Sequence, residues 1–396
     1  MRILIIHQQL PFPADNGGKL RASHVARYLA NHNSVALVCF GSEEFHPGFA
    51  ERQLFSEVKF VPLPSPATVL KRLFSGVPSE VVDLHSAEMY RTVSALVDLH
   101  KPEVILISDP MLSPYIARYT DQVRVLDYLM VSTLSLARLG DITQGWKKLL
   151  WRLRWHRSAA YHCRIAPLYD LCLVNSQEDY DDLLANCAGW KRLEFFPNGL
   201  HLDEYPLGLA QADPQTLIYP GSVTYAPNRD AVEYMITRIL PLVRADLPDV
   251  RLVVTGTVPE DGSAPQGPGV IYTGRLPDIR SAIAGANVCV VPLRSGAGGT
   301  RFKVLEAMAL GTPVVSTTIG AEGVEWSDGA NIAIADEPAR FAARTIELLK
   351  SAELRAKLSR AGRRLIEELY DWNVLGSRIS GMLAKLVEEK KRLTSK

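Results

Sequence analysis

The 396-residue sequence lacks a charge imbalance, a paired set of cysteines and a long apolar run. Lys and Arg total 44 against 43 Asp and Glu, so no overall field attracts the chain to nucleic acid or membrane. Its cysteines are odd in number and form no CxxC pair, which predicts reduced thiols in a cytosolic compartment without a disulfide framework or a zinc site. These five residues are Cys39, Cys163, Cys172, Cys187 and Cys289.

The apolar residues are spread over the chain in short runs. No run approaches the ~18 residues that a membrane-spanning helix needs. The start, MRILIIHQQLPFPADNGG, turns polar too soon for a signal peptide. We therefore expect a cytoplasmic protein that acts in solution or at the cytoplasmic face of the membrane. A composition of 47% hydrophobic and 22% charged residues is typical of a globular protein.

Short runs rich in Val, Ile and Leu alternate with amphipathic stretches. This alternation predicts an α/β protein with parallel sheets buried on both faces. A polar, proline-containing stretch from 197 to 214 separates two series of runs. We predict two Rossmann-like domains, 1–197 and 198–371, followed by a helix over 372–396. The expected strands are 2–6, 34–40, 57–61, 103–107, 123–126 and 171–174, then 216–219, 250–254, 269–273, 287–291 and 312–316.

Polar residues follow several strands of the first domain. His7, Asp109 and Asp127 come at the carboxyl ends of their strands, where ligands of parallel sheets bind. We predict that all three contact an acceptor substrate, with Asp127 also acting as a catalytic base or hydroxyl ligand. The alternatives are that each aspartate caps a helix and that His7 is a structural histidine.

The segment from Arg294 to Val315 places a glycine-rich loop before a helix predicted over 300–310. Free N–H groups and the helix dipole make such a helix start an anion site. Arg301 and Lys303 lie in the first turn, where cations oppose the dipole by ~0.3–1 kcal/mol each. A bound diphosphate reverses that penalty, since each charge-assisted hydrogen bond contributes ~1.5–3 kcal/mol. The alternative is that Arg301 and Lys303 extend to solvent and that Lys303 pairs with Glu306.

Glu306 lies one turn further along the same helix among apolar and small residues. An acid in such surroundings needs a partner. A pair of ribose or sugar hydroxyls fits, because a carboxylate accepts two hydrogen bonds.

Four motifs in a fixed order resemble the donor half of the family-four glycosyltransferases of the GT-B fold. They are Tyr219-Pro220-Gly221-Ser222, Ala226-Pro227-Asn228, YTGRLPD over 272–278 and GTRFKVLEAM over 299–308. The likeness extends over roughly 216–335, and more loosely to the first domain through Asn16-Gly17-Gly18.

The resemblance implies that the second domain binds a nucleotide sugar. The helix start holds the pyrophosphate, Glu306 the ribose, and the loop at 274–276 flanks the base. It also implies that the Gly17-Gly18 loop closes on the phosphates or the acceptor, that the last helix crosses back to the first domain, and that the transferred sugar retains its anomeric configuration. The expected donor-binding residues are Gly17, Gly18, Gly221, Ser222, Asn228, Arg275, Leu276, Gly298, Gly299, Thr300, Arg301, Lys303 and Glu306.

The sequence departs from the family pattern at two places. Gly298 stands where the family often has a glutamate that contacts the donor sugar. The basic pair that many members carry after the first strand of the donor domain is absent beside Gly221-Ser222. Arg301 and Lys303 are then the expected catalytic cations, because they receive the charge of the leaving phosphate.

No metal or other cofactor is predicted, since the nucleotide sugar is a substrate. Asp179-Tyr180-Asp181 resembles a metal-binding Asp-x-Asp pair, but Ser176 three residues before Asp179 favours a helix cap.

The stretch 146–164 has six Lys or Arg, no acid and three of the chain's six Trp. On a helical wheel the leucines share one face, which we expect to pack inward. Trp151 and Trp155 stand among cations on the other face, which we expect to meet anionic headgroups. The alternative is a helix packed on both sides.

We predict a glycosyltransferase that moves a sugar from a nucleotide sugar to the hydroxyl of a sugar or lipid-linked acceptor. The segment 146–164 is the predicted membrane contact, and no nucleic acid partner is expected. A sugar-nucleotide epimerase and a non-catalytic sugar-nucleotide-binding scaffold are the alternatives.

Overall fold

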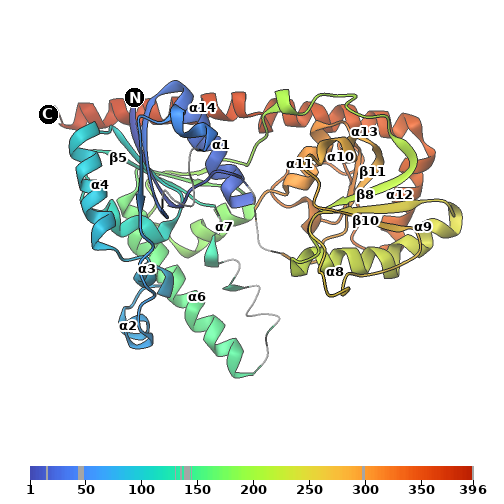
Figure 1. Cartoon of the computed structure of the whole chain (residues 1–396), viewed down its shortest axis with the longest axis horizontal. Helices are drawn as coiled ribbons and strands as arrows, with labels where there is room; N and C mark the ends of the chain where they lie inside the picture. The colour runs from blue at the N-terminus through green and yellow to red at the C-terminus, as the bar shows by residue number, and fades with distance from the viewer. Residues whose placement is uncertain are drawn as a thin grey trace. The chain divides into compact units, whose positions relative to one another are not determined.

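We describe a computed structural model of the chain (Figure 1). It describes residues 1–14, 17–42, 49–129, 131–133, 136–137, 143, 145–296 and 299–394. The chain divides into two units, which are described separately. Unit 1 comprises Met1–Phe196, Ala297–Gly299 and Leu375–Lys396, and unit 2 comprises Pro197–Gly296 and Thr300–Val374.

Unit 1 is built on a seven-stranded sheet in the order β3-β2-β1-β4-β5-β6-β7, with every recorded pair parallel. The central strands are buried along their whole length, because they are covered on both faces. The strands are β1 Arg2–Gln9, β2 Ser34–Phe40, β3 Glu57–Val61, β4 Val104–Ile107, β5 Val123–Asp127, β6 Leu171–Val174 and β7 Leu193–Phe195. The helices are α1 Gly17–His32, α2 Val69–Phe74, α3 Ser79–Asp83, α4 Ala87–His100, α6 Trp146–Ile165 and α7 Gln177–Asn186, with a 3-10 helix η3 at Pro110–Tyr115.

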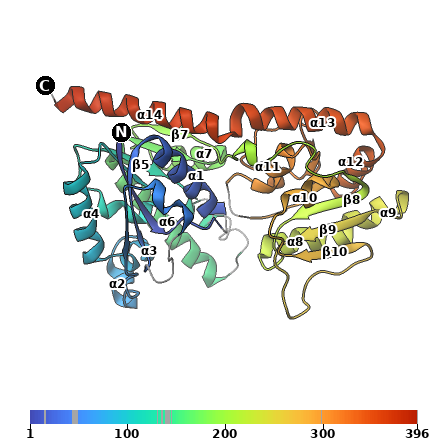
Figure 2. The same ribbon diagram turned by 45° about the horizontal axis from the view of Figure 1, so that its top comes forward.

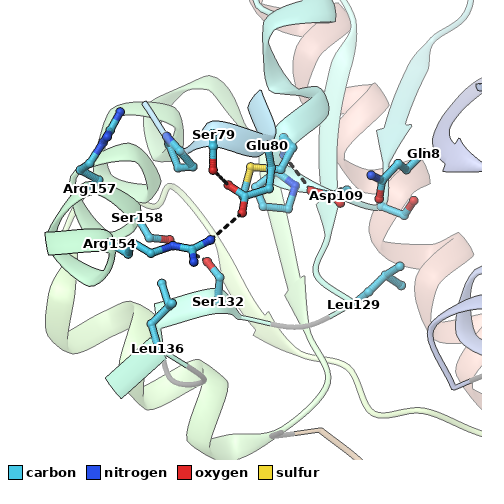
Figure 3. Close-up of a pocket in the computed structure, with 14 residues that line it drawn as sticks. Gln8, Ser79, Glu80, Asp109, Leu129, Ser132, Leu136, Arg154, Arg157 and Ser158 are labelled. Atoms are coloured by element: carbon cyan, nitrogen blue, oxygen red, sulfur yellow. Dashed lines mark hydrogen bonds and ion pairs between the residues drawn. The ribbon is translucent and has the colours of Figure 1, made fainter. Parts of the chain in front are cut away.

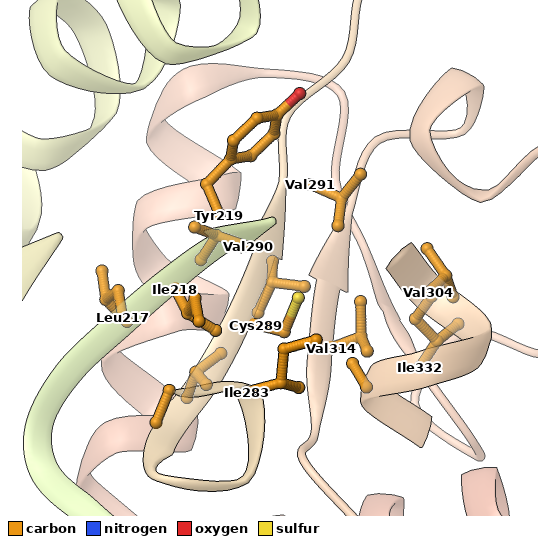
Figure 4. Close-up of a cluster of buried hydrophobic side chains, with 14 of the residues drawn as sticks. Leu217, Ile218, Tyr219, Ile283, Cys289, Val290, Val291, Val304, Val314 and Ile332 are labelled. Carbon is orange, nitrogen blue, oxygen red and sulfur yellow. The ribbon is translucent and has the colours of Figure 1, made fainter. Parts of the chain in front are cut away.

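Unit 2 has a six-stranded parallel sheet in the order β10-β9-β8-β11-β12-β13. Figure 2 shows β8, β9 and β10 side by side, and Figure 4 shows the apolar side chains that β8, β11 and β12 supply to the core. The strands are β8 Asp213–Pro220, β9 Arg251–Thr255, β10 Val270–Gly274, β11 Ala286–Val291, β12 Val314–Ser316 and β13 Ala333–Ile334. The helices are α8 Ala226–Tyr234, α9 Leu240–Asp246, α10 Arg280–Ala284, α11 Phe302–Ala309, α12 Pro338–Lys350 and α13 Ala352–Leu365. A 3-10 helix η7 covers Ile319–Ala321.

The last helix, α14 (Trp372–Thr394), begins in unit 2 and belongs to unit 1 from Leu375 onward. A Cβ on Gly376 would lie 2.1 Å from the ring of Tyr28, so only glycine permits this close approach of α14 to α1. Further along, Lys390 forms an ion pair of 2.9 Å with Asp170. These contacts hold the C-terminal part of the chain to unit 1.

The α/β class and the paired parallel sheets confirm the predicted fold. The division after Phe196 lies one residue from the predicted boundary at 197. Two strands, β7 and β13, were not predicted, because they are only three and two residues long. The sheet neighbour, rather than the local sequence, determines that such segments are extended.

Candidate functional site

The first turn of α11 in unit 2 holds a lysine that bonds to no acidic side chain among the described residues. Lys303 Nζ donates to the hydroxyl oxygen of Tyr219 at 2.9 Å and to Oδ1 of Asn228 at 3.0 Å, and it lies 4.1 Å from the centroid of the Tyr219 ring. Tyr219 ends β8 and Asn228 lies in the first turn of α8, so three elements converge on the ammonium group. Within the described chain, its hydrogen bonds go to neutral oxygens alone.

In the described structure no carboxylate bonds to Lys303, and Glu306 attracts its charge only from a longer distance. Burial lowers the pKa of its amine to about 7, with the nearby Arg301 adding to the effect. A partly desolvated ammonium at a helix start is unfavourable on its own. An anion in this position would restore the ordinary pKa and make the arrangement favourable.

Gly221 gives the backbone close access to the same ammonium group. A Cβ at this position would lie 2.9 Å from Nζ of Lys303 and 2.9 Å from Nδ2 of Asn228. The Asn228 amide also donates to the carbonyl oxygen of Ser222 at 2.9 Å, which orders the turn after β8. The Tyr219-Pro220-Gly221-Ser222 motif therefore forms one wall of the lysine site.

Glu306 lies one turn after Lys303 on α11 and does not pair with it. Its carboxylate accepts a hydrogen bond from the Tyr205 hydroxyl at 3.1 Å. Burial raises the pKa of Glu306 to about 7, and the Tyr205 hydrogen bond and Lys303 oppose this rise. The alternative of a Lys303–Glu306 surface pair is thus wrong, and both groups are poised to change charge near neutral pH.

Arg301 differs from the expected phosphate ligand. Its guanidinium forms a 2.7 Å ion pair with Glu322, with both side chains almost fully buried, and donates from Nε to the carbonyl of Ile319 at 3.2 Å. The charge of Arg301 is therefore compensated within the protein. Its position ties the loop after η7 to the start of α11, and Lys303 is left as the unneutralised cation of the pair.

The other residues predicted for the donor lie at several places. Thr300 is buried, and its hydroxyl accepts from the backbone N–H of Asn198 at 3.4 Å. Gly299 has a φ of +100°, a conformation that favours glycine. Arg275 and Leu276 directly follow β10, with Arg275 exposed. Gly17 and Gly18 begin α1 in unit 1, while Gly298 and Asn16 lie outside the described residues.

Unit 1 contains a cavity of about 420 Å³ whose lining includes Asp109 and Glu80 (Figure 3). Asp109 follows β4 and caps η3 by accepting from the backbone N–H of Met111 at 2.8 Å. Ser108 also lines the cavity, and its buried hydroxyl has no hydrogen-bond partner in the described part of the chain. The wall opposite Gln8 comes from α6, through Arg154 and other residues.

The carboxyl group of Asp109 is strongly affected by its surroundings. Burial raises its pKa to about 6, with the charge of Glu80 adding to the rise. Such a carboxylate readily accepts a hydrogen bond from a ligand hydroxyl. Asp109 is therefore able to cap η3 and to bind a ligand hydroxyl at the same time.

Asp127 does not fit the predicted role of a catalytic base. Its carboxylate is fully buried and binds the Arg21 guanidinium from α1 by contacts of 2.9 Å to Nε and 2.5 Å to NH2. Arg21 donates in addition to the carbonyl of Phe196 at 2.9 Å. The pair is enclosed within unit 1, and Asp127 does not line the described cavity.

His7 is likewise a buried side chain outside the cavity lining. Its Nδ1 accepts from the N–H of Gln9 at 3.2 Å, and burial lowers its pKa to about 4, so the ring is neutral at physiological pH. The structural interpretation of His7 is the one that the geometry favours.

Two further expectations concern helices. Ser176 accepts from the backbone N–H of Asp179 at 3.1 Å, which confirms the cap of α7. On α6 the expected faces are reversed: Leu149, Leu150 and Leu153 are exposed, whereas Trp151 and Trp155 line a second cavity of about 420 Å³. The wheel predicted the grouping of these residues correctly but assigned the wrong side to the interior.

Several contributing residues were not predicted as site residues. Tyr219 stood in a recognised motif, but its role beneath Lys303 depends on how β8 and α11 pack. Tyr205 and Glu322 are distant in sequence from the groups that they bind, by 101 and 21 positions. The sequence did contain a signal for Arg21, because this arginine stands among the apolar residues of the helix α1.

The comparisons with known proteins agree with this geometry. Residues 214–351, which include the lysine site, match the family described as glycosyl transferases group 1. The chain has the GT-B fold, and the likeness to the group 1 glycosyltransferases covers residues 214–351. It is 30% identical over 194 residues to a phosphatidyl-myo-inositol mannosyltransferase of Propionibacterium freudenreichii, covering 47% of this chain and 49% of that protein. The corresponding protein of Mycobacterium leprae is 30% identical over 200 residues, covering 46% and 51%.

The chain thus spans about half the length of the curated relatives it matches. Among solved structures, sucrose-phosphate synthase from Thermosynechococcus elongatus superposes with a TM-score of 0.72 at 15% identity, covering 98% of this chain and all of that chain. Anabaena HepE in complex with UDP gives 0.69 at 15% identity, covering 97% and 100%. These likenesses show the fold.

Proposed function

We propose that the protein transfers a sugar from a nucleoside-diphosphate sugar to an acceptor hydroxyl, with retention of anomeric configuration. The observation that carries the proposal is Lys303 in the first turn of α11, which bonds to no carboxylate in the described part of the chain and is surrounded by Gly221, Tyr219 and Asn228. Breaking the bond between sugar and diphosphate develops negative charge on the leaving phosphate. A cation in a desolvated site stabilises that charge more strongly than one in water.

In this proposal Lys303 receives the diphosphate and Glu306 binds the ribose hydroxyls. The depressed pKa of the lysine and the raised pKa of the glutamate both return toward ordinary values when these ligands bind. The nucleotide in the HepE complex, UDP, supports a diphosphate donor for this fold. Metal is not required, because the lysine and the helix start supply the positive charge.

We assign the acceptor to the cavity beside Asp109 in unit 1. Its buried carboxylate and the Ser108 hydroxyl, which has no hydrogen-bond partner among the described residues, provide hydrogen-bonding groups for a polyol or sugar. The names of the curated relatives, phosphatidyl-myo-inositol mannosyltransferases, support an acceptor carried on a lipid. Transfer would then take place at the cytoplasmic face of a membrane.

The test has a donor part and an acceptor part. Thermal-shift measurements with UDP-, GDP- and ADP-sugars are expected to show stabilisation by one of these donors. Transfer is then measured with that donor, labelled in the sugar, and a lipid extract. Asp109→Asn is expected to lower transfer while leaving donor affinity unchanged.

The outcomes distinguish the competing functions. Conversion of the nucleotide sugar without any acceptor would indicate an epimerase, and donor binding without hydrolysis or transfer would indicate a scaffold. No stabilisation by any of the three donors would reject the proposal.

A further inference from the structure

Two helices of unit 1 expose apolar side chains that no described residue covers. On α6 the exposed stripe follows the spacing i, i+3, i+4, i+7, with Trp146 70%, Leu149 60%, Leu150 47% and Leu153 52% exposed. On α2 Val69 is 69%, Leu70 67% and Phe74 84% exposed. An apolar set of this kind is unusual on the surface of a monomer and indicates an interaction site.

The two helices are joined by one arginine. NH2 of Arg157 on α6 donates to the carbonyls of Arg72 and Val77 at 2.8 and 2.7 Å, and to the hydroxyl of Ser75 at 3.2 Å. These contacts fix the C-terminal end of α2 against the middle of α6. Figures 1 and 2 both show α2 beside α6, at the end of unit 1 away from α14. The two apolar stripes therefore lie on adjoining helices, which together form what we call the α2–α6 surface.

Exposed cations border the apolar stripe. Lys147, Lys148 and Arg152 flank it on α6 and Lys71 does so on α2, and none of the four has an ion-pair partner in the described ranges. The first turn of α6 has no acid, and Gly145 before it provides no side-chain cap. Cations in this turn oppose the helix dipole, and nearby anions would remove that cost.

We propose that the α2–α6 surface inserts its apolar side chains into the interface of an anionic lipid bilayer. An apolar stripe with cations on its flanks is the arrangement of helices that lie in the plane of a membrane. No helix of the described chain is long and apolar enough to cross a membrane, so binding takes place at its surface. The inference is independent of the proposed transfer reaction.

This assignment differs from the one based on the sequence in two respects. The inserting residues are Trp146 and the leucines, whereas Trp151 and Trp155 line a cavity. The second half of the surface comes from α2, which has no unusual charge or tryptophan content.

The test is vesicle flotation with the full chain. Vesicles of phosphatidylcholine containing phosphatidylglycerol are expected to bind the protein more tightly than vesicles of phosphatidylcholine alone. The triple variant F74S/L149S/L153S is expected to lose about a thousandfold in partitioning, since burial of each of the three side chains contributes roughly a factor of ten. The variant L99S/L184S serves as a matched control, because both leucines are exposed elsewhere on unit 1.

The charge variant K147E/K148E is expected to abolish the preference for phosphatidylglycerol. Brominated lipids are expected to quench the fluorescence of the parent more than that of W146F, a readout that holds even where the triple variant folds poorly. Unchanged flotation of a folded triple variant would overturn the proposal. Light scattering that shows a dimer lost in this variant, with vesicle binding unaffected, would assign the surface to a second copy of the chain instead.

Discussion

Unit 1 and unit 2 each hold a charged side chain at the end of a secondary-structure element, and the two differ in whether a group of opposite charge binds them. Asp127 ends β5 in unit 1 and is bound by Arg21, a partner of opposite charge. Lys303 lies in the first turn of α11 in unit 2 and has only the neutral oxygens of Tyr219 and Asn228 within hydrogen-bond distance in the described structure. The first charge is satisfied by the fold, whereas for the second we propose that the donor diphosphate supplies the counter-charge.

The difference teaches that burial alone does not identify a functional charge. Burial opposes ionisation of both groups, since it raises the pKa of Asp127 and lowers that of Lys303. Arg21 counteracts this effect at Asp127, but no carboxylate does so equally closely at Lys303. A buried charge without a counter-charge is the stronger indicator of a binding site.

The largest expected effect comes from Asp127→Asn. It leaves the buried Arg21 without a counter-charge, which costs about 3–5 kcal/mol in the free energy of unfolding. Denaturant unfolding measures this loss, and donor affinity in unit 2 is expected to remain. Asp121→Asn, at an exposed position, is the control. A variant with full stability and no transfer would instead return Asp127 to the catalytic role that the sequence suggested.

Lys303→Ala is expected to have the next largest effect. Removing the ammonium group weakens nucleotide-sugar binding by ~1.5–3 kcal/mol, or roughly 10- to 150-fold. Calorimetry with the donor found in the thermal-shift screen measures it. Arg301→Ala is the contrasting variant. Because it loses the ion pair with Glu322, it is expected to lower the free energy of unfolding more than the affinity for the nucleotide sugar. Equal affinities of Lys303→Ala and the parent would refute the phosphate role.

The sequence predicted the local geometry around Lys303 better than the surroundings of Asp127 for a physical reason. Gly221, Lys303 and Glu306 lie in short motifs whose helix and turn geometry is local, so their positions follow from spacing. Whether Asp127 meets a substrate or an arginine depends on a side chain 106 positions away. The exposed face of α6 posed the same difficulty, because its periodicity determines the stripe but not which side the rest of unit 1 covers.

The pH dependence of donor binding tests both titrating groups of α11. Lys303 has a lowered pKa of about 7, so its proton, and with it the phosphate affinity, is lost as pH rises through that value. Glu306 has a raised pKa of about 7, so its ionised form, which accepts ribose hydroxyls, is lost as pH falls. Affinity is therefore expected to be greatest near pH 7.

A nucleotide sugar is the suitable ligand, since both its phosphates are esterified and do not titrate in this range. Glu306→Gln is expected to flatten the acidic limb of the profile and to leave the alkaline limb in place. A profile that is flat in the parent protein would show that neither group titrates in the free site.

The smallest effect is expected from Gly221→Ala. The added methyl group lies 2.9 Å from both Lys303 Nζ and Asn228 Nδ2, so the lysine must shift by a few tenths of an ångström. Its hydrogen bonds to Tyr219 and Asn228 lengthen, and donor affinity is expected to fall severalfold with little change in stability. Calorimetry and thermal unfolding measure the two quantities. Gly381→Ala is the matched control, because a Cβ there meets no atom within 4 Å. If both variants bind the donor equally well, donor affinity does not depend on the exact position of the Lys303 ammonium group. The difference between Lys303 and the Arg21–Asp127 pair would then lie in the missing counter-charge alone.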